Sequence, residues 1–188
     1  MNRARFYDVI RLPLFHGTLS QSQVDGLEHL LDYAEPRRPR LDLRQTAYML
    51  ATAYHETART MQPIAEYGCG AGYPYGVPDP ETGEVYFGRG YVQLTWKQNY
   101  AYQQAKLGLP LLVQPDLALH AAYAAEILYE GMCDGDFTGV SVSDYIDDGQ
   151  CDYVNARRVV NGLDCADAIA GYAQVFQEAL LQATCPCL

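Results

Sequence analysis

"AYHETARTMQPIAEYG", residues 53–68, places two glutamates on either side of a proline. An apolar pattern of helical period runs over residues 42–61, so Glu56 is expected inside a helix that Pro63 ends. A continuous helix would hold Glu56 and Glu66 about 15 Å apart, whereas a chain that turns back after the proline can bring them together. The stretch therefore holds either the acid and base of a hydrolase or two unrelated surface charges.

The surroundings of Glu56 favour the first interpretation. The expected helix carries an apolar stripe on the face opposite Glu56, formed by Ala47, Leu50, Ala51, Tyr54, Ala58 and Met61. The neighbours on its own face are also small or uncharged: Met49, Thr52, Ala53 and Thr60. A helix with such residues on both faces is usually covered on both. Partial burial favours the protonated form of a carboxyl group, which is the form that a general acid needs. The spacing leaves Glu81 and Glu84 as alternatives to Glu66 for the second carboxylate.

Composition excludes several classes of protein. The chain has 188 residues, of which 49% are hydrophobic, and a net charge of −10, so a nucleic-acid binder is not expected. No apolar run reaches the roughly 18 residues of a membrane span, and no signal peptide is recognised, so no membrane insertion is expected. His55 lacks a second histidine four residues on, where Arg59 stands. The six cysteines show no zinc-type spacing, and we expect neither metal nor cofactor.

The rest of the chain reads as one mainly helical domain, residues 1–188. Helices are expected over 20–34, after Thr95, over 116–132, over 141–160 and over 164–182, with "PRRPR" (36–40) as a linker. Residues 67–90 are rich in Gly, Pro and Tyr, which predicts a long functional loop with at most a small β-hairpin around "EVYF". "YVQL" (91–94) is expected to form a short strand.

Three blocks occur in a familiar order: "AYHET" at 53–57, "YFGRGYVQLTWKQNY" at 86–100 and "RRVVNG" at 157–162. With them, the chain resembles glycoside hydrolase family 19, and in particular its bacterial and bacteriophage endolysin branch. The resemblance implies an α+β, lysozyme-like fold that is mainly α-helical.

The resemblance also implies roles for individual residues. Glu56 matches the general acid, Glu66 the second carboxylate, and Thr95 a residue that helps to hold the attacking water. Thr95 is also a possible N-cap of the helix that follows it. The remaining matches are substrate-binding residues (Gln93, Asn99, Asn161, Tyr91 and Trp96) and structural supports of the site (Arg89, which would brace the acid, and His55).

The implied function is an endolysin-like lysozyme, or muramidase, that cleaves β-1,4 bonds of peptidoglycan glycan strands with inversion. A chitinase acting on chitin oligomers is the close alternative, and an inactive glycan-binding or structural protein is an alternative of another class. We expect a monomer that is made in the cytoplasm without a signal peptide. A holin or a secretion system would then bring it to the periplasm or the cell exterior.

Overall fold

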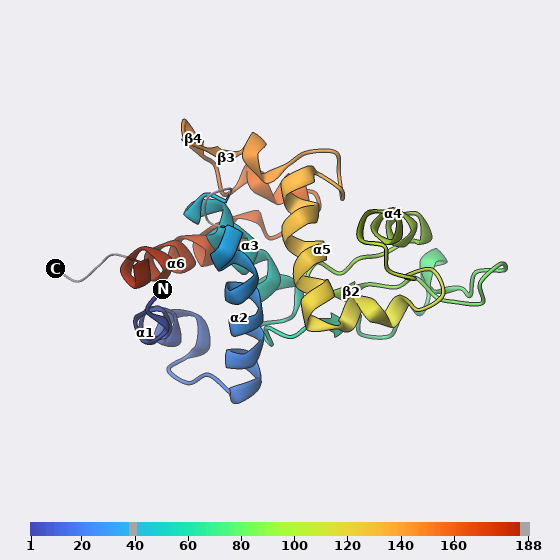
Figure 1. The fold of residues 1–188 in the computed structure, drawn as a ribbon, viewed down its shortest axis with the longest axis horizontal. Helices are drawn as coiled ribbons and strands as arrows, with labels where there is room; N and C mark the ends of the chain where they lie inside the picture. The colour runs from blue at the N-terminus through green and yellow to red at the C-terminus, as the bar shows by residue number, and fades with distance from the viewer. Residues whose placement is uncertain (38–40, 185–188) are drawn as a thin grey trace.

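The computed structural model describes residues 1–37 and 41–184, and within these ranges the chain is mainly helical (Figure 1). The described helices are α1 (Arg3–Phe15), α2 (Gln21–Ala34), α3 (Leu43–Glu56), α4 (Lys97–Leu107), α5 (Ala121–Asp134) and α6 (Ala166–Thr184). Two antiparallel pairs of two-residue strands complete it, β1 (Ile64–Ala65) with β2 (Arg89–Gly90) and β3 (Ile146–Asp147) with β4 (Gln150–Cys151). The predicted fold class is confirmed.

Helix α3 lies at the centre of the hydrophobic core. Every residue from Gln45 to Tyr54 is buried. Its most extensive neighbour is α6, which also lies along α1, while α5 and β3 cover other parts of α3 (Figure 1). The prediction that this helix is covered on both faces is therefore confirmed.

The ends of α3 fix the position of Glu56. Asp42 accepts a hydrogen bond as N-cap, and its own backbone amide donates to the side-chain oxygen of Gln45, so the predicted start is confirmed. The predicted end is wrong: the helix stops at Glu56. The Thr57 hydroxyl donates to the Ala53 carbonyl (2.7 Å) and accepts from the Met61 amide (3.1 Å), which takes the place of further helical bonds. Glu56 is thus the last helical residue and lies where the chain leaves the core.

The strand pair β1–β2 ties together the two ends of the Gly/Tyr-rich loop, residues 66–88. Ile64 pairs with Gly90 and Ala65 with Arg89, and the loop projects to the right in Figure 1. The predicted hairpin around "EVYF" does not form as strands. Instead, a turn joins Asp79 and Glu84 through a 2.8 Å bond from the Asp79 amide. "YVQL" is a tight turn and not a strand, because Arg89 and Leu94 exchange backbone hydrogen bonds across it.

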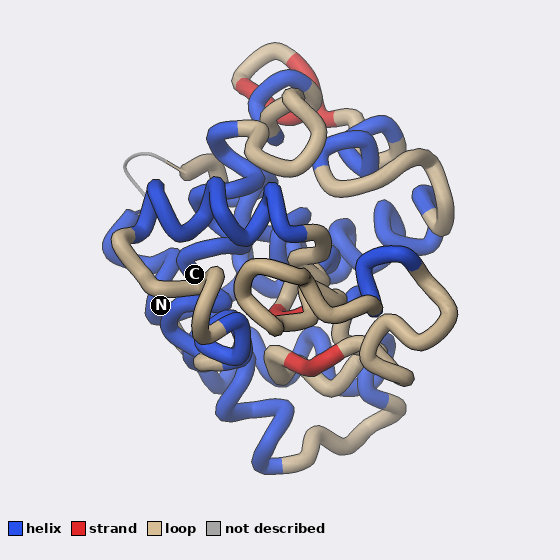
Figure 2. The backbone as a smooth tube through the Cα atoms, turned by 90° about the vertical axis from the view of Figure 1, so that its right-hand side faces the viewer, coloured by secondary structure: helices blue, strands red, loops and turns tan. Residues whose placement is uncertain are grey.

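The remaining predictions have mixed outcomes. Helices α2, α5 and α6 lie close to their predicted ranges, but α1 was not predicted. The pattern over 141–160 is not an α-helix. It forms two short 3₁₀ helices, Val142–Asp144 and Asn155–Val159, on either side of the β3–β4 hairpin, and Figure 2 shows that hairpin apart from the β1–β2 pair.

Short 3₁₀ helices also occur at Glu35–Arg37, Pro74–Gly76 and Pro115–Leu119. Most of the predicted "PRRPR" linker lies outside the described residues. Within the described ranges, none of the helices has the length and apolar character that crossing a membrane requires.

Candidate active site

A polar pocket of about 340 Å³ opens at the end of α3. Six of the predicted site residues line it: Glu56, Gln93, Thr95, Trp96, Asn99 and Asn161. The other lining residues are Tyr75, Val92, Leu94, Phe137 and Val160. The pocket therefore gathers residues from three stretches of the chain that the sequence motifs had singled out separately.

Glu56 lies in this pocket as one half of an ion pair. Its Oε1 atom accepts a 2.6 Å hydrogen bond from Nη1 of Arg157, whose side chain is only 3% exposed, while that of Glu56 is 15% exposed. The Arg157 Nε atom donates to the Asp164 carbonyl at 3.1 Å, which fixes the guanidinium. No donor among the described residues reaches Glu56 Oε2, so this oxygen can meet a ligand.

The segment from Gln93 to Trp96 is held in an unusual backbone conformation. Gln93 and Trp96 both have positive backbone φ angles, 53° and 74°, which residues other than glycine rarely adopt. The side-chain amide nitrogen of Gln93 (Nε2) donates to the backbone carbonyls of Ile64 (3.1 Å) and Gly90 (3.2 Å) and so ties the segment to the β1–β2 pair. Trp96 is left 42% exposed at the edge of the pocket.

Thr95 is not the N-cap of α4. Trp96 occupies the cap position and makes no side-chain cap bond. The Thr95 hydroxyl donates to the backbone carbonyl of Gln93 at 2.6 Å. The side-chain amide of Asn99 donates to the backbone carbonyl of Thr95 at 2.9 Å. The hydroxyl oxygen keeps lone pairs that can accept a hydrogen bond from water.

Glu66 lies beside the pocket and is not among its lining residues. Its Oε1 accepts from the Tyr75 hydroxyl (2.9 Å), and its Oε2 accepts from the Gly88 amide (3.1 Å). Gly88 lies close to two side chains of the pocket wall, because a Cβ atom on it would come 2.9 Å from Gln93 Oε1 and 3.3 Å from Thr95 Oγ1.

The two alternative carboxylates lie elsewhere. Glu81 is 80% exposed and pairs with Lys97 at 2.6 Å, and Glu84 lines a different pocket together with Asp116 and His120. Among the loop carboxylates, this geometry favours Glu66.

Besides Glu66, three predicted residues do not line the pocket. Tyr91 is fully buried in the core, where its hydroxyl has no partner among the described residues and burial raises its pKa, so it cannot contact a glycan. His55 is half-buried near the end of α3 and does not line the pocket. Arg89 is buried but does not brace Glu56. It donates to the carbonyls of Val85 (2.9 Å) and Phe87 (3.3 Å) and pairs with Asp116, so it stabilises the chain next to Gly88.

The sequence analysis missed Arg157 and Phe137, and it considered Tyr75 only as one of several aromatic residues that could stack on a sugar. Arg157 opens the "RRVVNG" block, so its motif was recognised but its contact with Glu56, 101 residues away, was not. Tyr75 and Phe137 have no local sequence signal that separates them from other aromatic residues.

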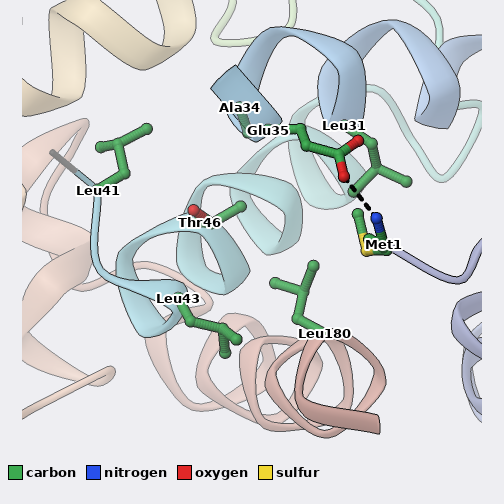
Figure 3. A pocket seen from close by; sticks show the side chains of 8 residues that line it. All are labelled: Met1, Leu31, Ala34, Glu35, Leu41, Leu43, Thr46 and Leu180. Carbon is green, nitrogen blue, oxygen red and sulfur yellow. Dashed lines mark hydrogen bonds and ion pairs between the residues drawn. The ribbon is translucent and has the colours of Figure 1, made fainter. Parts of the chain in front are cut away.

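A second, more apolar pocket, of about 210 Å³, lies between α2, α3 and α6 (Figure 3). Its wall includes Leu31, Leu43 and Leu180, and an ion pair between the Met1 amino group and Glu35 (2.6 Å) lies at its edge. None of the predicted site residues lines it, so the polar pocket at Glu56 is the candidate active site.

Comparison with known proteins gives the fold a family context. No family model matches the chain. Two endochitinases of Arabidopsis thaliana match it, one at 29% identity over 133 residues (65% of this chain and 40% of that protein) and one at 32% over 93 residues (44% and 29%). The chain thus spans less than half the length of these curated relatives.

Two solved structures superpose over nearly the whole chain. Chitinase C of Streptomyces griseus matches with a TM-score of 0.63 and 22% identity, covering 98% of this chain and 94% of that one. A bacterial family 19 chitinase matches with a TM-score of 0.56 and 22% identity, covering 94% and 93%. At these identities the likeness establishes the fold.

Proposed function

We propose, from the family 19 chitinase fold of this chain, that it is a glycoside hydrolase cleaving β-1,4 bonds in glycans that contain N-acetylglucosamine. The observation that carries the proposal is the position of Glu56. A glutamate at the edge of the core lines a polar pocket, with one oxygen bound by a buried arginine and the other open to a ligand. Glu66 lies on the far side of Gly88 and is available as the second carboxylate.

The proposed chemistry is a single displacement. Glu56 donates a proton from Oε2 to the glycosidic oxygen while Arg157 holds Oε1 in place. Glu66, with the Thr95 hydroxyl, orients a water and removes its proton as it attacks the anomeric carbon.

Chitin is the first substrate that we propose. The relatives and structural neighbours named above are all called chitinases. The net charge of −10 also gives no attraction to an anionic cell wall, whereas chitin is neutral. Peptidoglycan, which the sequence favoured, shares the N-acetylglucosamine unit and stays the second candidate. The endolysin branch stays a prediction.

One experiment separates these substrates from an inactive binding protein. Purified protein is incubated with chitin oligosaccharides and, separately, with purified peptidoglycan, and new reducing ends are counted against a Glu56→Gln control. Release from chitin that the control lacks supports the proposal, and release from peptidoglycan alone moves the assignment to a muramidase. Binding without release from either glycan contradicts hydrolysis.

The place of action follows from the substrate. Both glycans lie outside the cytoplasm, so we propose that the protein acts at or beyond the cell envelope. Fractionation of the source cells with an antibody to the chain tests this, and protein confined to the cytoplasm throughout growth and lysis contradicts it. The export route, by holin or secretion system, and the monomeric state stay predictions.

A further inference from the structure

The carboxylate of Glu66 is held at both oxygens. The Tyr75 hydroxyl donates to Oε1 at 2.9 Å, and the Gly88 amide donates to Oε2 at 3.1 Å. Each carboxylate oxygen can accept about two hydrogen bonds. Both oxygens therefore keep room for one further contact.

Tyr75 is itself held firmly in the loop. Its ring stacks on Tyr73, with centroids 5.1 Å apart and planes 4° apart, and meets Trp96 edge-on at 5.1 Å. The following residue, Gly76, lies so close to Gly70 that a Cβ atom there would come 1.9 Å from the Gly70 carbonyl oxygen. The backbone on both sides of the loop thus fixes where the Tyr75 hydroxyl points.

Tyr75 is also the link between Glu66 and the pocket. Tyr75 lines the polar pocket next to Trp96, whereas Glu66 does not. Its hydroxyl and Thr95 Oγ1 approach the Glu66–Gly88 pair from two different segments of the chain. A carboxylate that has to activate water at this wall depends on Tyr75 for its orientation.

We propose that Tyr75 is a positioning residue that keeps the Glu66 carboxylate oriented toward the pocket. The inference rests on the proposed function, since it assigns Glu66 the role of water-activating base. It extends that function to a residue that none of the sequence motifs contains.

The hydroxyl of Tyr75 remains a donor over the whole useful pH range. Burial, and then the hydrogen bond to Glu66, raise the pKa of Tyr75 to about 12. The other charged or titratable groups in this region are Tyr73 on the loop, Tyr100 on α4 and Arg89, which is paired with Asp116. Within the described residues, none of these other groups donates a hydrogen bond to the Glu66 side chain, whereas Tyr75 does.

The first test compares Tyr75→Phe with Tyr73→Phe. Both changes remove one hydroxyl and keep the ring, but the Tyr73 hydroxyl makes no hydrogen bond within the described residues. Tyr75→Phe should lower kcat about ten- to a hundredfold, the effect of losing one hydrogen bond to a charged group, with little change in KM. Equal, small effects of the two variants would overturn the proposal.

The second test does not depend on catalysis. Glutamate carboxyl groups are labelled with ¹³C, and the Glu66 resonance is identified by its loss in Glu66→Gln. At a fixed neutral pH its chemical shift should change in Tyr75→Phe, which loses the hydrogen bond to Glu66, and should stay unchanged in Tyr73→Phe. An unchanged chemical shift in Tyr75→Phe refutes the inference even in an active enzyme. A changed chemical shift in a protein that cleaves no glycan upholds the contact and refutes the proposed function.

Discussion

At the scale of single residues, one carboxylate oxygen of Glu56 is bound by the protein, and the other is available to a ligand in the pocket. Arg157 holds Oε1 at 2.6 Å with a guanidinium that is almost wholly buried. A buried cation of this kind needs its counter-charge, because removing one partner of a buried ion pair leaves the other uncompensated. The same carboxyl group is thus structural through Oε1 and, by our proposal, chemical through Oε2.

Glu56→Gln should therefore affect both activity and stability. We expect hydrolysis to fall about 10²–10⁴-fold, the usual contribution of a general acid. The amide oxygen can still accept from Arg157, so the cost in unfolding free energy should be moderate, about 1–3 kcal/mol. Glycan release and urea unfolding measure the two effects. More than about a tenth of wild-type activity would remove Glu56 from the role of acid.

The second carboxylate can be identified by three parallel substitutions. Glu66→Gln should lower activity far more than Glu81→Gln or Glu84→Gln, because only Glu66 is joined to the pocket through Tyr75 and Gly88. The Glu81 variant serves as the matched control, since that side chain pairs with Lys97 at an exposed position. If Glu81 or Glu84 were the sensitive position, the base would lie on the outer part of the loop.

At the scale of elements, the structure shows which boundaries a sequence can predict. The starts of α2 and α3 were predicted because a capping box is local: Ser20 with Gln23, and Asp42 with Gln45, lie within one turn of helix. The end of α3 depends instead on the Thr57 side chain and on a left-handed backbone at Ala58, a position where the sequence has no glycine to indicate it. That end sets the position of Glu56, and for this reason the boundary that matters most for the site was not predicted.

The N-cap of α3 gives a pH-dependent prediction. The Arg44 side chain, through its hydrogen bond, lowers the pKa of Asp42 below its usual value. A lowered folded-state pKa stabilises the fold above the unfolded value, and that stability is lost as the pH falls through the folded value.

Asp42→Ala should consequently cost about 1 kcal/mol at pH 7. The difference from wild type should begin to shrink below about pH 4, where Asp42 of the unfolded chain takes up a proton while the folded cap is still ionised. Urea unfolding of both proteins across this range measures it. A difference that stays constant down to about pH 2 would show that the charge of Asp42 does not contribute.

At the scale of the whole molecule, the sequence predicted the fold class and six of the residues that line the pocket. The blocks at 53–57, 86–100 and 157–162 carried that information. The sequence did not predict that Tyr91 belongs to the core, because an aromatic residue inside a motif has the same pattern whether it is buried or exposed. Nor did it predict the Arg157–Glu56 contact, since helical and strand periodicity report nothing about pairs 101 residues apart.

The proposed mechanism also predicts the stereochemistry of the reaction. By our proposal, Glu56 and Glu66 approach the glycan from different segments, and Glu66 acts on water together with Thr95. A single displacement of this kind inverts the anomeric centre, so a β-linked glycan should first release the α-anomer. Proton NMR of the product, recorded before mutarotation, reads the outcome directly. A β-anomer at the earliest times would mean that Glu66 does not activate water.

The dependence of Glu56 on Arg157 has a consequence for how the protein is made. Ribosomes release the N-terminal part of a chain first, at about 5–20 residues per second. Glu56 therefore emerges long before the arginine that it binds, and α3 emerges long before α6, which covers it. Asn2 and Ala183 are likewise joined by a 2.8 Å backbone hydrogen bond, so α1 too waits for the end of α6. We expect a nascent chain, or a fragment stopped before residue 157, to contain both glutamates and yet leave every glycan intact. By our proposal, hydrolytic activity then begins only after α6 has left the ribosome.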